Sequence, residues 1–207
     1  MRGQDSVEED RPSQIAQTEE ADMRRQFISI SLVVVIILGF AGTGEAKRLV
    51  LKPARVTSMT SPDESRDERV LVYFDLPEGL KISPTEIDFA KLVFKAQIAD
   101  AASGQLQIYP LTSSWKDTPT LGWEQTWDKA GGDYSIEHPC KHISIRSDEG
   151  LKSLRFDVTF VVLAWLDGTM ENHGFIVVPS KADLRDSDVE FTFDTSGMEL
   201  VISYNPD

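Results

Sequence analysis

The feature that most constrains the fold is an alternation of apolar and polar residues with a period of two. Leu92, Phe94 and Ala96, for example, alternate with Lys91 and Lys95. Successive side chains of an extended strand point to opposite faces of a sheet, so such a segment buries one face and exposes the other. The pattern returns at 69–76, 105–109, 154–158, 189–193 and 200–204, and 175–178 is a short, continuous apolar run. Short strands of this kind, separated by glycine-containing turns such as 194–197, predict an antiparallel β-sandwich with a jelly-roll-like arrangement.

One segment, 159–167, breaks the period of two. Val162 and Trp165 share one face of a helix there, and Thr159 is a candidate N-cap. Gly168 follows and can end the helix in a left-handed conformation. We therefore expect one short helix that packs over one end of the sandwich.

The N-terminal 46 residues differ in character from the rest. Residues 1–22 are polar and acidic, and a disordered tail is expected because such a stretch buries too little apolar surface to offset its ordering entropy. An apolar run of 16 residues, 27–42, then follows Arg24 and Arg25 and precedes small residues around Ala46. This order of basic, apolar and small residues is typical of a secretory signal peptide at 23–46.

Two alternatives remain open for this segment. Translation from Met23 gives a signal peptide of ordinary length and leaves residues 1–22 untranslated, whereas a start at Met1 is compatible with 27–42 as an uncleaved membrane anchor. Both alternatives export residues 47–207, as a single domain, to the cell envelope or the extracellular space. The only membrane contact expected is then through 27–42, if it is uncleaved.

Composition narrows the partners and the chemistry. The chain has 34 acidic and 21 basic residues, a net charge of −13, and this balance argues against a nucleic-acid partner because phosphate contacts need clustered lysine and arginine. A single cysteine excludes an intrachain disulfide framework. The sequence contains no serine nucleophile elbow, no zinc-protease helix motif and no phosphate-binding glycine loop. We therefore expect a protein that is not an enzyme.

The residues best suited to binding lie in one short stretch. Trp123, Trp127 and Tyr134 stand among glycines, and Lys116 and Asp117 precede them. Sugar rings present apolar faces that stack on exposed indole or phenol rings, while nearby polar groups hydrogen-bond the hydroxyls. These five residues form the candidate carbohydrate site, and packing in the core is the alternative for the tryptophans.

Two other groups of residues are candidate metal ligands. His138, Cys140 and His142 are spaced by two, so a regular strand would project all three from one face toward a zinc or copper ion. The alternative is an edge loop with a small buried cysteine and two solvent-exposed histidines. Acidic clusters at 63–64, 67–68 and 183–188 are candidate calcium ligands, with a solvated charged surface as the alternative. Apart from these, no cofactor is expected.

The order of several segments resembles a known family. The segments are RVLVYFDLP at 69–77, AKLVF at 90–94, LQIYPLTSSW at 106–115, WEQTW at 123–127, AWLDG at 164–168, NHGF at 172–175 and LVISY at 200–204. Together, over about residues 49–204, they resemble the DNRLRE domain family. This family comprises exported β-sandwich modules similar to polysaccharide-binding and disaggregatase-related domains.

The resemblance implies a non-catalytic accessory role, with carbohydrate binding at the cell surface or outside the cell as the main expectation. It also implies that Trp115 and Trp165 are buried, and that Asp75 and Asp157 make structural hydrogen bonds at strand ends. The alternative function is that of a structural or adhesive surface protein, which contacts protein partners and has no sugar site.

Overall fold

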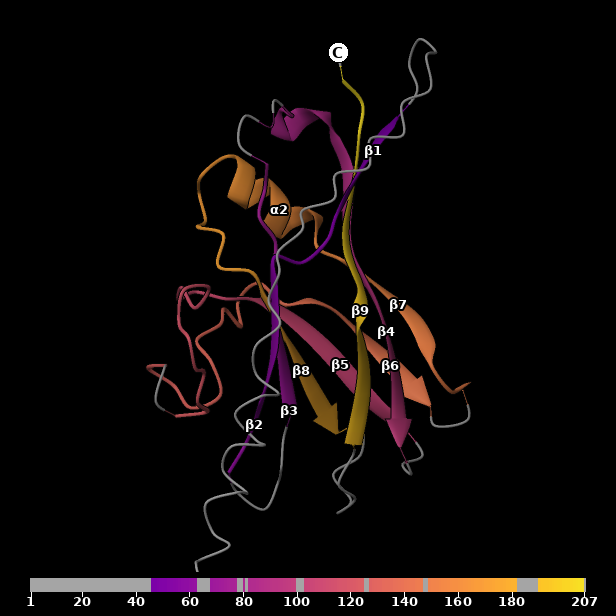
Figure 1. Ribbon diagram of the computed structural model, residues 1–207. Coiled ribbons are helices and arrows are strands. Elements are labelled where there is room, and N and C mark those ends of the chain that lie inside the picture. Colours follow the sequence, from indigo (N-terminus) through magenta and orange to yellow (C-terminus); the bar gives the residue numbers. More distant parts are fainter. Residues whose placement is uncertain are drawn as a thin grey trace, which may run out of the picture. The chain divides into compact units, whose positions relative to one another are not determined.

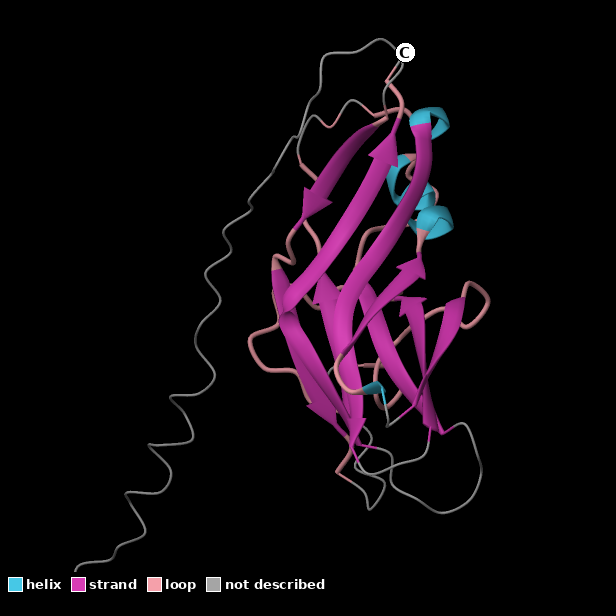
Figure 2. Ribbon diagram, turned by 90° about the vertical axis from the view of Figure 1, so that its right-hand side faces the viewer, coloured by secondary structure: helices cyan, strands magenta, loops and turns pink. Residues whose placement is uncertain are grey.

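The structure is a computed structural model, and it describes residues 46–62, 68–77, 80, 82–99, 103–124, 127–146, 149–181 and 190–206. Within them, nine strands form two antiparallel sheets that pack against each other, which confirms the expected β-sandwich (Figures 1 and 2). The expected tail and the expected signal or anchor, apart from Ala46, lie outside the described residues. Among the helices that are described, none combines the length and the apolar character needed to cross a bilayer.

Each sheet mixes strands from distant parts of the sequence. The four-stranded sheet has the order β1 (Lys47–Leu51), β9 (Glu190–Tyr204), β4 (Ile87–Ala99) and β7 (Lys152–Asp157). The five-stranded sheet has the order β2 (Arg55–Thr60), β3 (Glu68–Tyr73), β8 (Phe175–Lys181), β5 (Ser103–Pro110) and β6 (Cys140–Arg146).

The core between the sheets is built by the alternation seen in the sequence. Leu92, Phe94 and Ala96 of β4 are buried at 1% exposure or less, and Leu106 and Ile108 of β5 face them from the other sheet. The adjacent pairing of β4 with β7 adds an aromatic stack, because the ring of Phe94 lies parallel to that of Phe156 at a centroid distance of 5.5 Å. The inter-sheet core is therefore the part of the fold that the period of two specifies directly.

Among the described residues, the one α-helix is α2 (Thr159–Leu166), which joins β7 to β8 at one end of the strands (Figure 2). Val161, Val162 and Trp165 are buried against the inter-sheet core, and Trp165 packs on Phe175 at a ring distance of 4.7 Å. Gly168 follows the C-cap with a φ of 78°. The expected helix, its buried face and its glycine stop are all confirmed.

The start of α2 differs from the expectation. The N-cap residue is Val158, whose side chain makes no capping hydrogen bond. Thr159 is instead the first helical residue, and its hydroxyl donates to Oδ1 of Asp157 (2.6 Å) and accepts from the backbone N–H of Ala90 (2.9 Å). The threonine thus ties the helix to two strands of the four-stranded sheet. Hydrogen bonds from the hydroxyl and the backbone N–H of Thr159 hold the pKa of Asp157 below its ordinary value. Asp157 thus makes the structural hydrogen bonds expected of it at the end of a strand.

The C-terminal strand β9 also differs from the expectation of two strands joined by a turn at 194–197. Lys95 of β4 stands opposite Asp194, and Val93 stands opposite Glu199, so four residues of β9 (195–198) oppose only one residue of β4. These residues form a β-bulge in a continuous strand, because the chain returns to the same ladder after them. The hydroxyl of Ser196 donates to the Asp194 carboxylate (2.6 Å) within the bulge.

Candidate functional site

The outer face of the five-stranded sheet, which points away from the other sheet, is apolar. Leu71 and Tyr73 of β3, Met59 of β2 and Ile176 of β8 form a second hydrophobic cluster there, each at 8% exposure or less. Their strand neighbours, such as Val72, point into the inter-sheet core. The central strands of this sheet are therefore buried on both faces, which requires a cover on the outer side.

The cover is a compact loop between β5 and β6, which we call the strap and define as residues 111–124 and 127–134 (Figure 1, to the left of β2 and β3). Leu111 and Tyr134 pair as an isolated antiparallel bridge at its neck. Beside this bridge, the N–H of Thr112 donates to the carbonyl of Asp133 (2.9 Å). A loop whose ends meet and whose own side chains fill its interior can hold a defined shape without helices or strands.

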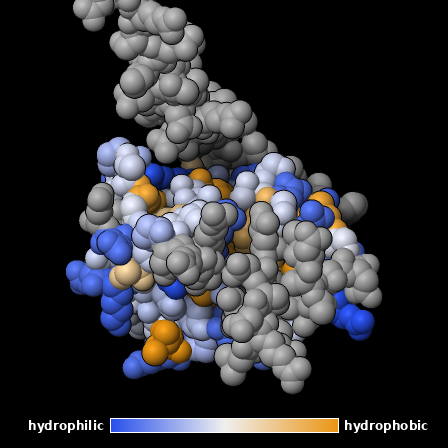
Figure 3. All heavy atoms as spheres, turned by 90° about the horizontal axis from the view of Figure 1, so that it is seen from below, coloured by the Kyte–Doolittle hydropathy of each residue, from blue (hydrophilic) through white to orange (hydrophobic). Residues whose placement is uncertain are grey.

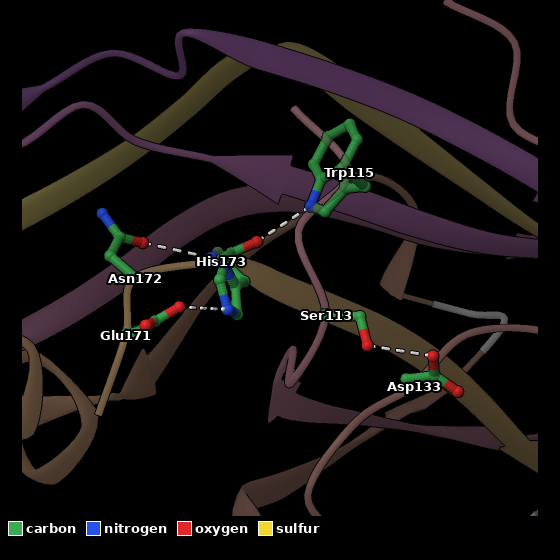
Figure 4. Close-up of polar contacts among 7 residues, drawn as sticks. Ser113, Trp115, Asp133, Glu171, Asn172 and His173 are labelled. Atoms are coloured by element: carbon green, nitrogen blue, oxygen red, sulfur yellow. Dashed lines mark hydrogen bonds and ion pairs between the residues drawn. The ribbon is translucent and has the colours of Figure 1, made fainter. Parts of the chain in front are cut away.

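Two tryptophans anchor the strap to the sheet. Trp115 is 1% exposed, and its indole N–H donates to the backbone carbonyl of His173 (2.8 Å; Figure 4). Trp127 is 8% exposed, and its indole N–H donates to the sulfur of Met59 (3.2 Å). The burial expected for Trp115 is confirmed. For Trp127 the structure shows the alternative stated for the tryptophans, packing in a core, because its ring is enclosed between the strap and the sheet.

A buried carboxylate organises the second half of the strap. Asp133 accepts hydrogen bonds from the backbone N–H groups of Asp128 (3.0 Å) and Lys129 (2.9 Å) and from the hydroxyl of Ser113 (3.0 Å; Figure 4). Burial raises the pKa of Asp133, but the two backbone hydrogen bonds and the Ser113 hydroxyl lower it by more. The group is therefore ionised at neutral pH, and it joins both ends of the strap.

Arg69 contacts two residues of the expected carbohydrate site, Trp123 and Tyr134. Its guanidinium lies 4.5 Å from the ring centroid of Trp123 and 5.7 Å from that of Tyr134, and its Nη1 donates to the carbonyl of Gly131 (2.6 Å). Gly131 has a φ of 82°, a backbone conformation that favours glycine, and a Cβ there would clash with the Arg69 guanidinium and the Trp123 ring. Trp123 and Tyr134 are both partly exposed.

A third partly exposed ring completes the group. Tyr109 of β5 packs against Tyr134 at a ring distance of 4.9 Å, and its hydroxyl donates to Oε1 of Gln107. Burial, with a smaller contribution from Tyr134, raises the pKa of Tyr109, so its hydroxyl stays protonated at neutral pH. We call Trp123, Arg69, Tyr134, Tyr109 and Gln107 the aromatic strip.

The sequence prediction found two of these five residues. It missed Arg69, Tyr109 and Gln107 because each lies on a strand at a position that alternation assigns to the outer face. The available signal was that Arg69 in 69–76, and Gln107 and Tyr109 in 105–109, alternate with apolar residues and are therefore expected on the outer face.

The other two residues of the expected carbohydrate site lie elsewhere on the strap. The ammonium of Lys116 is 5.3 Å from the ring centroid of Tyr73, at the end of β3. Burial raises the pKa of Tyr73, and the nearby lysine partly offsets this effect. Asp117 is exposed next to Lys116. The structure thus brings Trp123 and Tyr134 together and leaves Lys116 and Asp117 as neighbours of Tyr73.

The expected zinc or copper ligands do not converge. His138 shares a hydrogen bond with the hydroxyl of Ser135 (2.9 Å), and its ring stacks on Phe160 of α2 at 5.4 Å. Cys140 is buried in the inter-sheet core, where burial raises the pKa of its thiol to about 12, whereas His142 is exposed. Such a thiol stays protonated at neutral pH, and metals bind the thiolate.

A bulge in β6 explains the separation of Cys140 and His142. Ile108 of β5 stands opposite Cys140 and Leu106 stands opposite Ile143, so residues 141 and 142 oppose the single residue Gln107. The extra residue breaks the alternation on which the prediction of a shared face relied. In the described part of the chain, no three histidine, cysteine or acidic residues are grouped to hold a metal ion. Of the acidic clusters, 63–67 and 183–188 lie outside it.

A groove lies where β2 of one sheet faces β9 of the other. This groove has a volume of about 530 Å³. Val56, Val70, Phe191 and Phe193 supply its apolar lining, and hydroxyl-bearing residues and Glu68 supply its polar lining. Glu68 belongs to the acidic cluster at 67–68, a candidate for calcium binding, whereas the residues expected to bind carbohydrate and those expected to bind zinc or copper do not line the groove.

Comparison with known proteins adds no family. The chain matches no model of a known protein family, and a comparison with curated proteins finds no significant relative.

Proposed function

We propose that the protein is an exported, non-catalytic β-sandwich module that binds polysaccharide at the cell surface or outside the cell. The observation that carries the proposal is a group of three partly exposed rings on one face of the five-stranded sheet. Trp123 and Tyr134 both pack on Arg69, and Tyr109 packs on Tyr134. This function assigns ligand binding to the aromatic strip.

The chemistry of the strip suits a carbohydrate. Indole and phenol rings stack on the apolar faces of sugar rings, and the Tyr109 hydroxyl and the Gln107 amide lie beside them to hydrogen-bond sugar hydroxyls. The guanidinium of Arg69 packs on two of the rings and restricts them, so little side-chain entropy remains to be lost on binding.

Two features of the sequence support the same role. In residues 23–46, basic residues are followed by an apolar run and then by small residues, and this order is typical of the signal peptide of an exported protein. The ordered series of segments that resembles the DNRLRE family points to a polysaccharide-binding accessory module.

Affinity gel electrophoresis tests the proposal. The purified protein is run through native gels that contain β-glucan, xylan or polygalacturonate, with a gel lacking polysaccharide as reference. We expect retardation by at least one polymer, and the Trp123→Ala variant should bind about tenfold more weakly or worse because it loses a central ring. The matched control is Phe160→Ala, which removes an aromatic ring that is 61% exposed and lies on α2, outside the strip. Equal losses in both variants would contradict the proposal.

The alternative is a structural or adhesive surface protein with protein partners. The observation that favours it is the burial of Trp115, Trp127 and Trp165, which assigns three of the four indole rings to packing. Exposed apolar side chains at Ile136 and Phe160 are available for contact with a protein instead. On the face drawn in Figure 3, apolar side chains outside the grey residues appear as separate spots among hydrophilic ones. Absence of retardation by all three polysaccharides would favour this alternative.

A further inference from the structure

The strap is attached to the sheet by two arginines that use the same combination of contacts. Arg55 of β2 and Arg69 of β3 each place a guanidinium over a tryptophan of the strap and donate to strap carbonyls. Arg69 belongs to the aromatic strip, but Arg55 contacts a different part of the strap.

Arg55 makes the larger set of contacts. Its guanidinium donates to the carbonyls of Trp115 (3.0 Å), Lys116 and Thr118 (2.6 Å), and it lies 5.0 Å from the ring centroid of Trp115. The planar fork of arginine suits several acceptors at once, and hydrogen bonds from a charged donor are stronger than neutral ones. One side chain therefore satisfies three carbonyls of an irregular turn.

The strap depends on such contacts more than the strands do. Its backbone is tied to the sheet near its neck, through Leu111 and Tyr134, whereas its interior is held by buried indoles and the two arginines. Segments with few ladder hydrogen bonds open locally at a lower free energy than a packed sheet. Loss of Arg55 should then release the strap without unfolding the sandwich.

We propose that Arg55 is a positioning residue, which keeps the strap docked and thereby holds Trp123 and Tyr134 in the aromatic strip. The docking role stands on the contacts of Arg55 alone. The consequence for ligand binding rests on the proposed function.

Hydrogen exchange of the full chain, read by mass spectrometry, tests the docking role. In Arg55→Ala, amides of the strap should exchange about 100-fold faster, while those of β4 and β7 change less than threefold. Arg55→Lys keeps the charge but not the planar fork, so its exchange should lie between Arg55→Ala and the wild type. The matched control is Arg155→Ala, which removes an exposed arginine from β7 and should leave strap exchange unchanged.

A near-ultraviolet circular dichroism spectrum gives an independent signature. Arg55→Ala should lose part of the tryptophan signal, because Trp115 loses its fixed surroundings, and Arg55→Lys should recover some of it. Unchanged strap exchange in both variants would overturn the docking role. A uniform rise in exchange over strap and sheets would also overturn it, because Arg55 would then support the whole fold rather than the strap.

The consequence for ligand binding is tested by affinity gel electrophoresis of the same variants in gels with β-glucan, xylan or polygalacturonate. If the wild type is retarded, Arg55→Ala should bind at least tenfold more weakly although every ring of the strip is present. A variant with an open strap and unchanged retardation would contradict the positioning of the strip. If no polymer retards the wild type, the proposed function fails, and the exchange experiment still decides the docking role.

Discussion

The molecule contains two hydrophobic cores that are built in different ways. The inter-sheet core consists of strand residues such as Leu92, Phe94 and Phe156, which face each other because of their place in an alternating pattern. The outer core lies between the five-stranded sheet and the strap, and its largest members, Trp115 and Trp127, come from an irregular loop. The comparison shows that one sheet can bury both faces, with a second sheet on one side and a single loop on the other.

The polar contacts of the two cores differ as well. The strands of the inter-sheet core satisfy their backbone groups in ladders, whereas the strap relies on Arg55, Arg69 and Asp133. Its indoles find acceptors at the His173 carbonyl and the Met59 sulfur. We infer that the outer core is the less stable unit and that it opens first.

Matched truncations in the two cores should give the largest effects and should differ from each other. Phe94→Ala should lower the free energy of unfolding by about 4 kcal/mol, because it leaves a cavity that two packed sheets cannot close. Trp127→Ala removes a larger ring but should cost only about 2 kcal/mol, because release of the strap limits the loss. Urea unfolding followed by far-ultraviolet circular dichroism measures both values.

The reverse order, with Trp127→Ala the more damaging substitution, would contradict a separately opening strap. It would mean that the outer core is needed for the whole sandwich.

The Asp133 carboxylate should have a smaller, pH-dependent effect. Asp133→Asn keeps the shape but removes the charged acceptor of two backbone N–H groups, so it should lower the free energy of unfolding by about 1 kcal/mol at pH 7. The pKa of Asp133 is lower in the folded state than its ordinary value. Its contribution is therefore present above about pH 4, the range of an unperturbed aspartate, and is lost as pH falls through the folded-state pKa.

Unfolding curves of the wild type and the variant between pH 3 and pH 8 measure this effect. The difference should be constant at the neutral end and shrink toward the acidic end. A difference that grows as the pH falls would have the wrong sign for a carboxylate with a lowered pKa.

The inter-sheet core and the helix could be predicted from the sequence because each is specified by a pattern of neighbouring residues. Alternation in 91–98 and 154–158 specified the buried faces of β4 and β7, and the break in the pattern at 159–167 specified α2. The bulges at 195–198 and at 141–142 escaped prediction because residues inserted on one strand are visible only against its partner strand.

The outer core depends on long-range contacts and was therefore harder to predict. Trp127 and Met59 are 68 residues apart, and nothing in either local pattern links them. One signal was present, because Leu71 and Tyr73 are apolar on the face opposite to Val70 and Val72, as expected for a strand buried on both sides. That signal predicts a cover, but it does not tell which loop supplies it or which of its aromatic rings stay accessible.

Hydroxyl-radical footprinting of the wild-type protein, with residue-level mass spectrometry, tests most directly whether the strap sorts the aromatic residues into buried anchors and an accessible strip. We predict oxidation at Trp123, Tyr134 and Tyr109 and protection of Trp115 and Trp127, each compared with the unfolded chain to correct for intrinsic reactivity. Oxidation of Trp127 as fast as that of Trp123 would contradict the docked strap and, with it, the division of the molecule into two cores.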